Sequence, residues 1–269
     1  MVQQQSASRG TGWQPAQYAH FHDERARPFY DLAGLVQREA DMRVTDLGCG
    51  TGELTAWLHE ELGAKETVAI DNSPVMLGES AQYLRPGMRF EQIDILEAAK
   101  KYQGAFDLVF SNAALQWILD HESMLPQVTS MVRPGGQFAF QVPNNGGHFG
   151  HQLPAIIARE EPFASALGGL VREDPVQTPE WYATFLHDQL GCTDQRVRLE
   201  VYAHPMDSTR GIVEWVKGSV LSWYRERLPA DLYPKYLEEY EKRLVAKLGE
   251  PSPYFYTFTR ILMWGRMPE

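Results

Sequence analysis

The stretch Val44-Thr45-Asp46-Leu47-Gly48-Cys49-Gly50-Thr51-Gly52 decides the fold of this chain. A short apolar run within it ends in alternating glycines, and apolar residues at helical spacing follow over 54–62. This pattern predicts a strand, a tight turn and a helix. Because glycine lacks a Cβ and adopts positive φ easily, the backbone of such a turn can approach a bound ligand closely.

The next apolar run, 67–70, predicts a second strand, which ends at Asp71. An acidic side chain about 20 residues after a glycine-rich turn can accept hydrogen bonds from ribose hydroxyls. A dinucleotide site requires G-x-G-x-x-G, but Glu53 stands where its third glycine would be. Asp46, two residues before the first glycine, suits a cofactor that carries an ammonium group and no pyrophosphate. An ordinary strand-turn-helix and a nucleotide-binding variant are the alternatives.

The composition indicates one folded domain with an acidic character. The chain has 269 residues, of which 43% are hydrophobic and 12% aromatic, so it can bury a sizeable core. This length suits one α/β domain with an insertion or cap. The formal net charge of −10 and the isoelectric point of about 5.3 disfavour nucleic acid and anionic membranes as partners, since both select for basic patches.

The spacing of the cysteines and the length of the apolar runs indicate where in the cell the protein is expected. Cys49 and Cys192 are far apart in the sequence, which argues against a disulfide framework and for a reducing compartment. No apolar run approaches the length of a membrane span, and the first residues lack the charged-then-apolar pattern of a signal peptide. We therefore expect a cytoplasmic protein.

Predicted strands and helices alternate through the first half of the chain. The expected strands are 43–48, 66–71, 88–93, 105–111 and 136–142, and the expected helices are 52–62, 74–84 and 121–132. This alternation is typical of an α/β fold, and we expect a doubly wound, mostly parallel, Rossmann-like sheet. Ligands bind such sheets at the carboxyl ends of the strands, where the polar residues Asp46, Asp71, Asp94 and Asn112 are predicted to lie.

The pattern changes after Pro143, where Asn144-Asn145-Gly146-Gly147-His148 predicts a loop. Short helices are expected over 150–190, then a strand over 194–203, helices over 208–225 and 230–248, and a strand over 254–264. We expect a disordered tail over 1–12 and a single domain over 13–269, with a core formed by 40–143, 192–206 and 252–266. A helical cap, serving as a lid, is expected from 13–38, 144–190 and 207–250.

The motif D-x-G-x-G-x-G, followed by a strand that ends in Asp, resembles that of the class I S-adenosylmethionine-dependent methyltransferases. The resemblance implies that S-adenosylmethionine is the cofactor and S-adenosylhomocysteine the product. The implied cofactor-binding residues are Asp46, Gly48, Gly50, Gly52, Asp71, Asn72, Met76, Asp94, Ile95, Asn112, Ala113 and Trp117. Asn112 as a helix cap and Met76 as a packing residue are the alternatives at these two positions.

Further motifs look like those of the trans-aconitate 2-methyltransferase family. They are Trp13-x-Pro-x-x-Tyr18-x-x-Phe21-x-Asp23-Glu24-Arg25-x-Arg27-Pro28, Asn112-Ala-Ala-Leu-Gln-Trp117, Gln141-Val-Pro143-Asn, Trp215-Val-Lys217-Gly218 and Glu239-Tyr240-Glu241-x-Arg243-Leu244. Arg260 matches an arginine at the end of that family. The chain departs from the family at Gly50-Thr51-Gly52-Glu53, at Gly146-Gly147-His148 and at Thr259.

This resemblance implies methyl esterification of a small carboxylic acid, with trans-aconitate as the first candidate, by a monomer or weak homodimer. A carboxylate is already ionised at neutral pH, so we expect no general base and no catalytic side chain, and orientation of the reactants supplies the rate. Arginine forks would bind a polycarboxylate. The implied substrate-binding residues are Trp13, Tyr18, Arg25, Trp117, Gln141, Trp215, Tyr254 and Arg260.

Several alternatives are open at this point. The aromatic content of 213–264 is compatible with a lipid or terpenoid acid, and a hydroxyl or amine acceptor would give His20 and His22 a role as base. His148 and His151 lie near each other, but no Cys, Asp or Glu completes a metal site nearby, and we expect no metal. A non-catalytic protein that binds S-adenosylmethionine is the alternative from a different class.

Overall fold

The computed structural model describes residues 22–269, with side chains from Ala26 onward. The expectations for 1–12, Trp13 and Tyr18, and for the Arg25 side chain, lie outside the described residues. The described chain divides into two compact units: a sheet unit of 22–145, 173–204 and 257–269, and a helical unit of 146–172 and 205–256. The expected division into a core and a helical cap, and the role of the cap as a lid, remain predictions.

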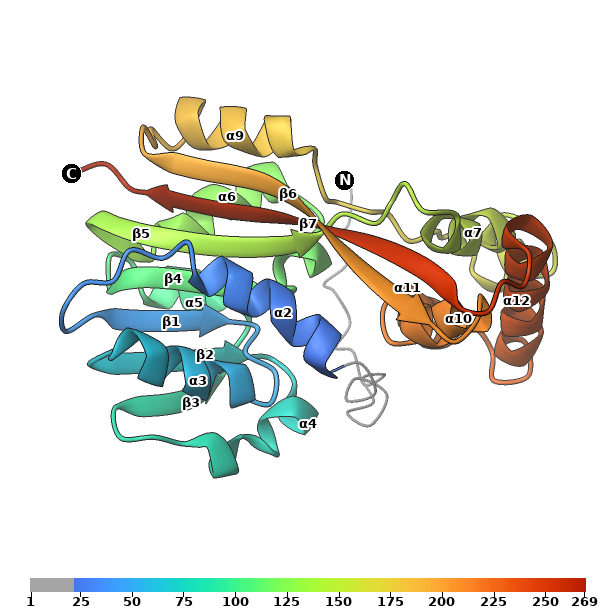
Figure 1. Cartoon of the computed structure of the whole chain (residues 1–269), viewed down its shortest axis with the longest axis horizontal. Coiled ribbons are helices and arrows are strands. Elements are labelled where there is room, and N and C mark those ends of the chain that lie inside the picture. The colour runs from blue at the N-terminus through green and yellow to red at the C-terminus, as the bar shows by residue number, and fades with distance from the viewer. Residues whose placement is uncertain (1–21) are drawn as a thin grey trace. The chain divides into compact units, whose positions relative to one another are not determined.

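Seven strands form one sheet in the order β3-β2-β1-β4-β5-β7-β6 (Figure 1). They are β1 (Arg43–Leu47), β2 (Glu66–Asp71), β3 (Met88–Gln92), β4 (Phe106–Asn112), β5 (Val132–Pro143), β6 (Gln195–Met206) and β7 (Tyr254–Arg266). The first five pair in parallel, whereas β7 runs antiparallel to β5. The doubly wound, mostly parallel α/β sheet that the sequence predicted is therefore confirmed.

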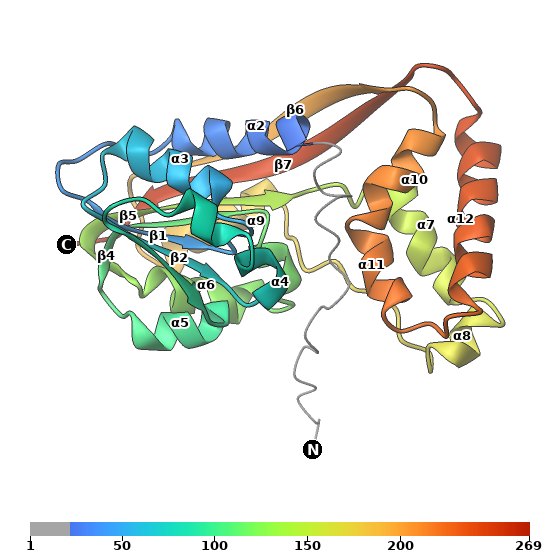
Figure 2. The same cartoon turned by 90° about the horizontal axis from the view of Figure 1, so that it is seen from below.

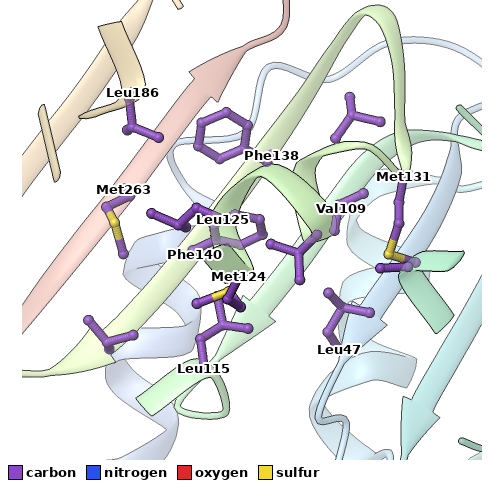
Figure 3. Close-up of a cluster of buried hydrophobic side chains, with 14 of the residues drawn as sticks. Leu47, Val109, Leu115, Met124, Leu125, Met131, Phe138, Phe140, Leu186 and Met263 are labelled. Carbon is purple, nitrogen blue, oxygen red and sulfur yellow. The ribbon is translucent and has the colours of Figure 1, made fainter. Parts of the chain in front are cut away.

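Helices cover both faces of this sheet. Helices α2 (His22–Ala33) and α3 (Glu53–Leu62) pack on one face, where Phe29, Leu58 and Trp264 are buried. Helices α5 (Ile95–Lys101), α6 (His121–Thr129) and α9 (Pro179–Asp188) pack on the other. Figure 3 shows this second cluster, in which side chains of β4, β5 and β7 meet those of α6 and α9. The core thus fixes the strands whose carboxyl ends carry the predicted site.

Several predicted bounds were wrong in the sheet unit. The helix predicted over 74–84 breaks into α4 (Pro74–Leu77) and the 3₁₀ helix η1 (Ser80–Tyr83). Helix α2 ends at Ala33, before the end of the helical segment expected over 13–38, and the following Leu35 and Val36 are buried against the sheet. Helix α5 was not predicted at all. It is a short helix that starts where Asp94 accepts a hydrogen bond from the Leu96 backbone N–H at 2.8 Å.

The helical unit holds α7 (Phe149–Ala158), α8 (Phe163–Ala166), α10 (Arg210–Lys217), α11 (Val220–Arg225) and α12 (Tyr233–Leu248), shown together in Figure 2. The single helix predicted over 208–225 is two helices, separated at Gly218 and Ser219. The apolar stripe of α12 is confirmed, since Tyr236, Tyr240 and Leu244 are its buried residues.

Two tyrosines of α12 form hydrogen bonds with backbone carbonyls of α7 near Pro154. Pro154 lies inside α7 and has no backbone N–H, so the Gly150 carbonyl four residues earlier lacks its helical donor. The Tyr240 hydroxyl donates to this carbonyl at 2.8 Å, and the Tyr236 hydroxyl donates to the Pro154 carbonyl at 2.5 Å. Both tyrosine rings are fully buried. The two hydroxyls therefore join α12 to α7 at the place where the helix backbone is incomplete.

Tyr240→Phe is expected to lower the free energy of unfolding by about 1–3 kcal/mol, because it leaves the buried Gly150 carbonyl without a donor. Urea denaturation followed by circular dichroism measures this change. Tyr233→Phe, at a partly exposed position of the same helix, is the control and should change the free energy by less than about 0.5 kcal/mol. Equal effects of the two variants would contradict the role given to the Tyr240 hydroxyl.

Candidate functional site

The glycine turn after β1 is closely packed at Gly48 and Gly52 and open at Gly50. All three glycines have positive φ: 78° at Gly48, 59° at Gly50 and 87° at Gly52. A Cβ at Gly48 would overlap the Ala114 side chain, and one at Gly52 would overlap the ring of Phe90. At Gly50, no heavy atom of the described chain lies within 4 Å of that position. The open side of the turn is therefore at Gly50, as a bound ligand requires.

The Asp71 carboxylate holds this turn against the loop that follows β2. One oxygen accepts the Gly50 backbone N–H at 2.9 Å, and the other accepts the Ser73 N–H at 2.8 Å. Burial raises the pKa of Asp71, and these backbone donors act in the opposite direction. The carboxylate thus connects the carboxyl ends of two neighbouring parallel strands.

The Asp46 carboxyl is buried beneath the same turn. It is 2% exposed and accepts a hydrogen bond from the Thr55 hydroxyl at 2.5 Å. Burial raises its pKa to about 7, with the nearby Asp71 charge acting in the same direction and the Thr55 hydroxyl against it. Burial also raises the pKa of the Cys49 thiol, as expected for a small packing residue and not for a reactive thiolate.

The other residues predicted to bind the cofactor follow the next strands of the same unit. Ser73 caps α4 by accepting the Met76 N–H at 3.3 Å, and Met76 is buried. Asp94 is exposed and caps α5, so one of its oxygens already has a structural partner. After β4, Ala113 has a φ of 54°, and Trp117 is 37% exposed. The structure brings all twelve predicted positions to the carboxyl ends of β1 to β4. They are Asp46, Gly48, Gly50, Gly52, Asp71, Asn72, Met76, Asp94, Ile95, Asn112, Ala113 and Trp117.

Two glutamines of β5 differ sharply in their hydrogen bonding. Both are fully buried on the α2 face of the sheet. Gln137 is satisfied: its oxygen accepts from the Trp264 indole at 2.8 Å and the Gln37 N–H at 3.0 Å, and its nitrogen donates to the Gln37 carbonyl at 2.6 Å. Gln141 has no partner for either amide atom among the described residues. A buried amide in this state points to a missing ligand or water.

Gln141 belongs to a group of such amides at the end of β4. Gln141 pairs with Asn112 in the sheet, and the backbone carbonyl of Gln141 accepts the Ala113 backbone N–H at 3.0 Å. The side-chain oxygens of Asn112 and Gln116 are also buried and lack a partner among the described residues. The Gln116 nitrogen donates to the Ala113 carbonyl at 2.6 Å. Several hydrogen-bonding atoms are therefore available next to the glycine turn.

Arg260 lies on the same face of the sheet as Gln141. In the antiparallel register of β5 and β7, Gln141 is opposite Leu262 and Pro143 is opposite Arg260. This makes Gln141 and Arg260 diagonal neighbours, about 7–8 Å apart between Cα atoms in an ordinary sheet. Arg260 is 8% exposed, and its guanidinium lies 4.9 Å from the centre of the Phe258 ring.

Two further predicted substrate residues, Trp215 and Tyr254, belong to the helical unit. Trp215 is 3% exposed and lies edge-on to the Tyr256 ring at 5.9 Å. The Tyr254 hydroxyl lies 3.2 Å from Nε2 of His148. The structure does not bring these two residues together with Gln141 and Arg260 within one unit.

Sequence reasoning missed Thr55 and Gln116. Thr55 lies in the first turn of α3, nine residues after its partner Asp46, where a polar residue amid an apolar pattern was the available signal. Gln116 was part of a quoted motif but was not assigned to the site. Among the side chains that the structure describes, no three His, Cys, Asp or Glu residues gather in a group that could hold a metal ion. None of the described helices has the length and apolarity needed to span a membrane.

Comparison with known proteins defines the class. A family model described as "Methyltransferase domain" matches residues 38–186. A trans-aconitate 2-methyltransferase from Deinococcus radiodurans is 39% identical over 96% of this chain and 99% of that relative. One from Variovorax paradoxus is 39% identical over 86% of this chain and 88% of the relative. This chain belongs to the trans-aconitate 2-methyltransferase family of class I methyltransferases.

Solved structures support the same fold. The YcgJ protein from Bacillus subtilis superposes with a TM-score of 0.56 at 16% identity, covering 92% of this chain and 99% of that one. Phosphoethanolamine N-methyltransferase 2 from Haemonchus contortus, solved with S-adenosylhomocysteine, gives a TM-score of 0.54 at 16% identity over 90% of this chain and 52% of that one. At this identity the likeness concerns the fold alone.

S-adenosylmethionine is the cofactor of this class, and the residues present fit it. The turn is open at Gly50, and Asp46 and Asp71 provide carboxyl groups on either side of that turn. The Asn112 side-chain oxygen, at the end of β4, has no hydrogen-bond partner within the described part of the chain. These features match a ligand with hydroxyl and ammonium donors.

The raised pKa of Asp46 predicts how stability depends on pH without ligand. Its folded-state pKa of about 7 exceeds the ordinary value of 3.8, so the folded protein keeps a proton that the unfolded chain releases between about pH 4 and pH 7. The free energy of unfolding therefore falls as the pH rises through this window, by up to about 4 kcal/mol from this group. Asp46→Asn removes the charge and can still accept from Thr55.

We expect Asp46→Asn to stabilise the ligand-free protein at pH 8 and to have little effect near pH 4. Urea denaturation at both pH values measures the difference, and Asp94→Asn, at an exposed cap, serves as the control. A stability change that is the same at both pH values would contradict the assignment of the raised pKa to Asp46.

Proposed function

We propose that this protein is an S-adenosylmethionine-dependent O-methyltransferase that forms the monomethyl ester of a small polycarboxylic acid, with trans-aconitate as the first candidate. The observation that carries the proposal is the fully buried Gln141 amide. It has no hydrogen-bond partner among the described residues, and it lies on the sheet as a diagonal neighbour of Arg260. The names of the relatives agree with it. A cytoplasmic location, and the absence of nucleic-acid and membrane partners, belong to the same proposal and rest on the acidic composition.

In this proposal the cofactor lies across the carboxyl ends of β1 to β4. Asp71 accepts the ribose hydroxyls while its backbone contacts keep the glycine turn in shape. Asp46 faces the ammonium group, and Asn112 and Ala113 border the methionine end. The bound cofactor supplies an activated methyl group, and the chain has to position the acceptor in line with it.

The acid is bound through charge and hydrogen bonds at the ends of β5 and β7. A guanidinium such as that of Arg260 binds a carboxylate in a fork. The Gln141 nitrogen can donate to the same or a second carboxylate, while its oxygen accepts from a donor. An acid with more than one carboxylate uses these groups better than an apolar monoacid. Trp13, Tyr18, Arg25, Trp117, Trp215 and Tyr254 remain predicted substrate-binding residues.

The chemistry requires little more than placement. The acceptor carboxylate is ionised at neutral pH, so no side chain has to remove a proton. Holding the carboxylate oxygen in line with the methyl group can lower the barrier by roughly 7–11 kcal/mol relative to reactants free in solution. Arg260 and Gln141 would hold the remaining carboxylates and leave one oxygen for methyl transfer.

Methyl transfer from labelled S-adenosylmethionine to a panel of acids tests the proposal. The panel holds trans-aconitate, cis-aconitate, citrate, isocitrate, and fatty and terpenoid acids. A base-labile methyl ester of trans-aconitate is the expected product. Transfer to an apolar acid alone would contradict the polyacid assignment, and binding without transfer to any acid would favour a hydroxyl or amine acceptor or a non-catalytic protein.

The two β5 glutamines provide matched variants for the substrate site. Gln141→Leu removes a buried amide that has no partner in the described chain, so we expect the melting temperature to stay equal or rise while kcat/KM for the acid falls about 10- to 100-fold. Gln137→Leu removes the hydrogen bonds of Gln137 with Gln37 and Trp264, so we expect the melting temperature to fall, and KM and kcat/KM for the acid to stay unchanged. Equal effects of the two variants on stability and on KM would remove Gln141 from the substrate site.

A further inference from the structure

The edge strand β6 has two contrasting faces. It is the last strand in the sheet order, beyond β7 (Figure 1). Val197, Leu199 and Val201 alternate along one face, and Leu199 and Val201 are 47% and 59% exposed. Arg198 and Glu200 lie on the opposite face, together with Tyr202, which stacks on Phe258 of β7 at 5.4 Å. The strand is therefore apolar and exposed on one side and charged on the other.

No turn, loop or side chain of the described residues forms a hydrogen bond with the backbone of Val197, Leu199 or Val201. The Asp194 carbonyl accepts the Arg266 N–H at 3.0 Å, so the groups of even-numbered residues that follow point toward β7. In a regular strand the backbone groups of Val197, Leu199 and Val201 then point away from β7. Exposed edges are commonly blocked by charged side chains, above all lysine, by proline, by a bulge or by a covering helix or loop, and the charges of β6 are those of Arg196, Arg198 and Glu200. Over 195–204, β6 contains no lysine or proline.

Two copies of β6, paired antiparallel, would place complementary residues opposite each other. In an antiparallel pair with a two-fold axis at Leu199, Leu199 faces its own copy and Val197 faces Val201. Arg198 then faces Glu200 on both sides of the axis, so each copy contributes one charge to each of two opposite-charge pairs. Within one chain, Arg198 Nε lies 3.6 Å from Glu200 Oε1, and both side chains are nearly half exposed. These charges can therefore turn toward a neighbouring strand.

We propose that β6 pairs with β6 of a second copy of this chain, in an antiparallel register centred on Leu199. The pairing joins two sheets across the two-fold axis and covers the exposed apolar side chains Leu199 and Val201. Neither the charged nor the apolar residues of this surface belong to the proposed cofactor or substrate site, so the dimer is independent of the proposed function. One pair of strands buries little surface, and the dimer is expected to be weak, with a concentration-dependent equilibrium.

Analytical ultracentrifugation of the full-length protein over a range of concentrations tests this pairing. Arg198→Glu places Glu opposite Glu, and Glu200→Arg places Arg opposite Arg, so each single variant should weaken dimerisation about tenfold or more. The double variant Arg198→Glu/Glu200→Arg restores both opposite-charge pairs and should dimerise like the original protein.

A mixture of the two single variants makes the test specific for contact between copies. A chain with Glu at 198 and 200 matches a chain with Arg at both positions, so an equimolar mixture should form heterodimers more tightly than either variant alone forms homodimers. Melting temperatures and methyl transfer of the single variants control for misfolding. A protein that stays monomeric at all concentrations, or a mixture that behaves as the average of its components, would overturn the proposal.

Discussion

The Asp71 carboxylate is the contact on which the site depends. Its two oxygens fix the backbone at Gly50 and at Ser73, so one side chain sets the positions of two loops. The Gly48 and Cys49 N–H groups of the glycine turn donate to the Ile70 carbonyl at 2.7 and 2.9 Å, whereas the Gly50 N–H donates to Asp71. The same carboxylate is the predicted acceptor for the ribose. The position of the Gly50 backbone and the predicted binding of the ribose therefore depend on the same residue at the end of β2.

Other polar groups of the site reduce the stability of the protein without ligand. Burial makes the ionised form of Asp46 unfavourable, and Gln141 leaves two buried amide atoms without partners among the described residues. Gln137, on the same strand, shows that this sheet can give partners to both amide atoms of a buried glutamine. Local departures from good packing and pairing are expected at functional sites, and here they lie at the carboxyl ends of the strands.

The strands β1 to β5 and the glycine turn that follows β1 could be predicted because their signals are local. Glycines at fixed spacing and acidic residues after apolar runs determine the turn and the strand ends wherever the rest of the chain lies. Helix α5 was missed because it is short and its cap, Asp94, was interpreted only as a ligand. The contrast between Gln137 and Gln141 could not be predicted, because it depends on whether Gln37 and Trp264, remote in sequence, reach the amide. The role of Tyr240 in completing α7 depends on a similarly remote pairing.

The most direct test of this account is the affinity of the protein for S-adenosylhomocysteine, measured by isothermal titration calorimetry in Asp71→Ala and Asp71→Asn. The account predicts that Asp71→Ala raises Kd about 100-fold or more, since the ribose acceptor and both backbone contacts are lost together. Asp71→Asn, which keeps one oxygen acceptor, should have an intermediate affinity. An Asp71→Ala protein that folds normally and binds within about threefold of the original affinity would contradict the central role of this carboxylate.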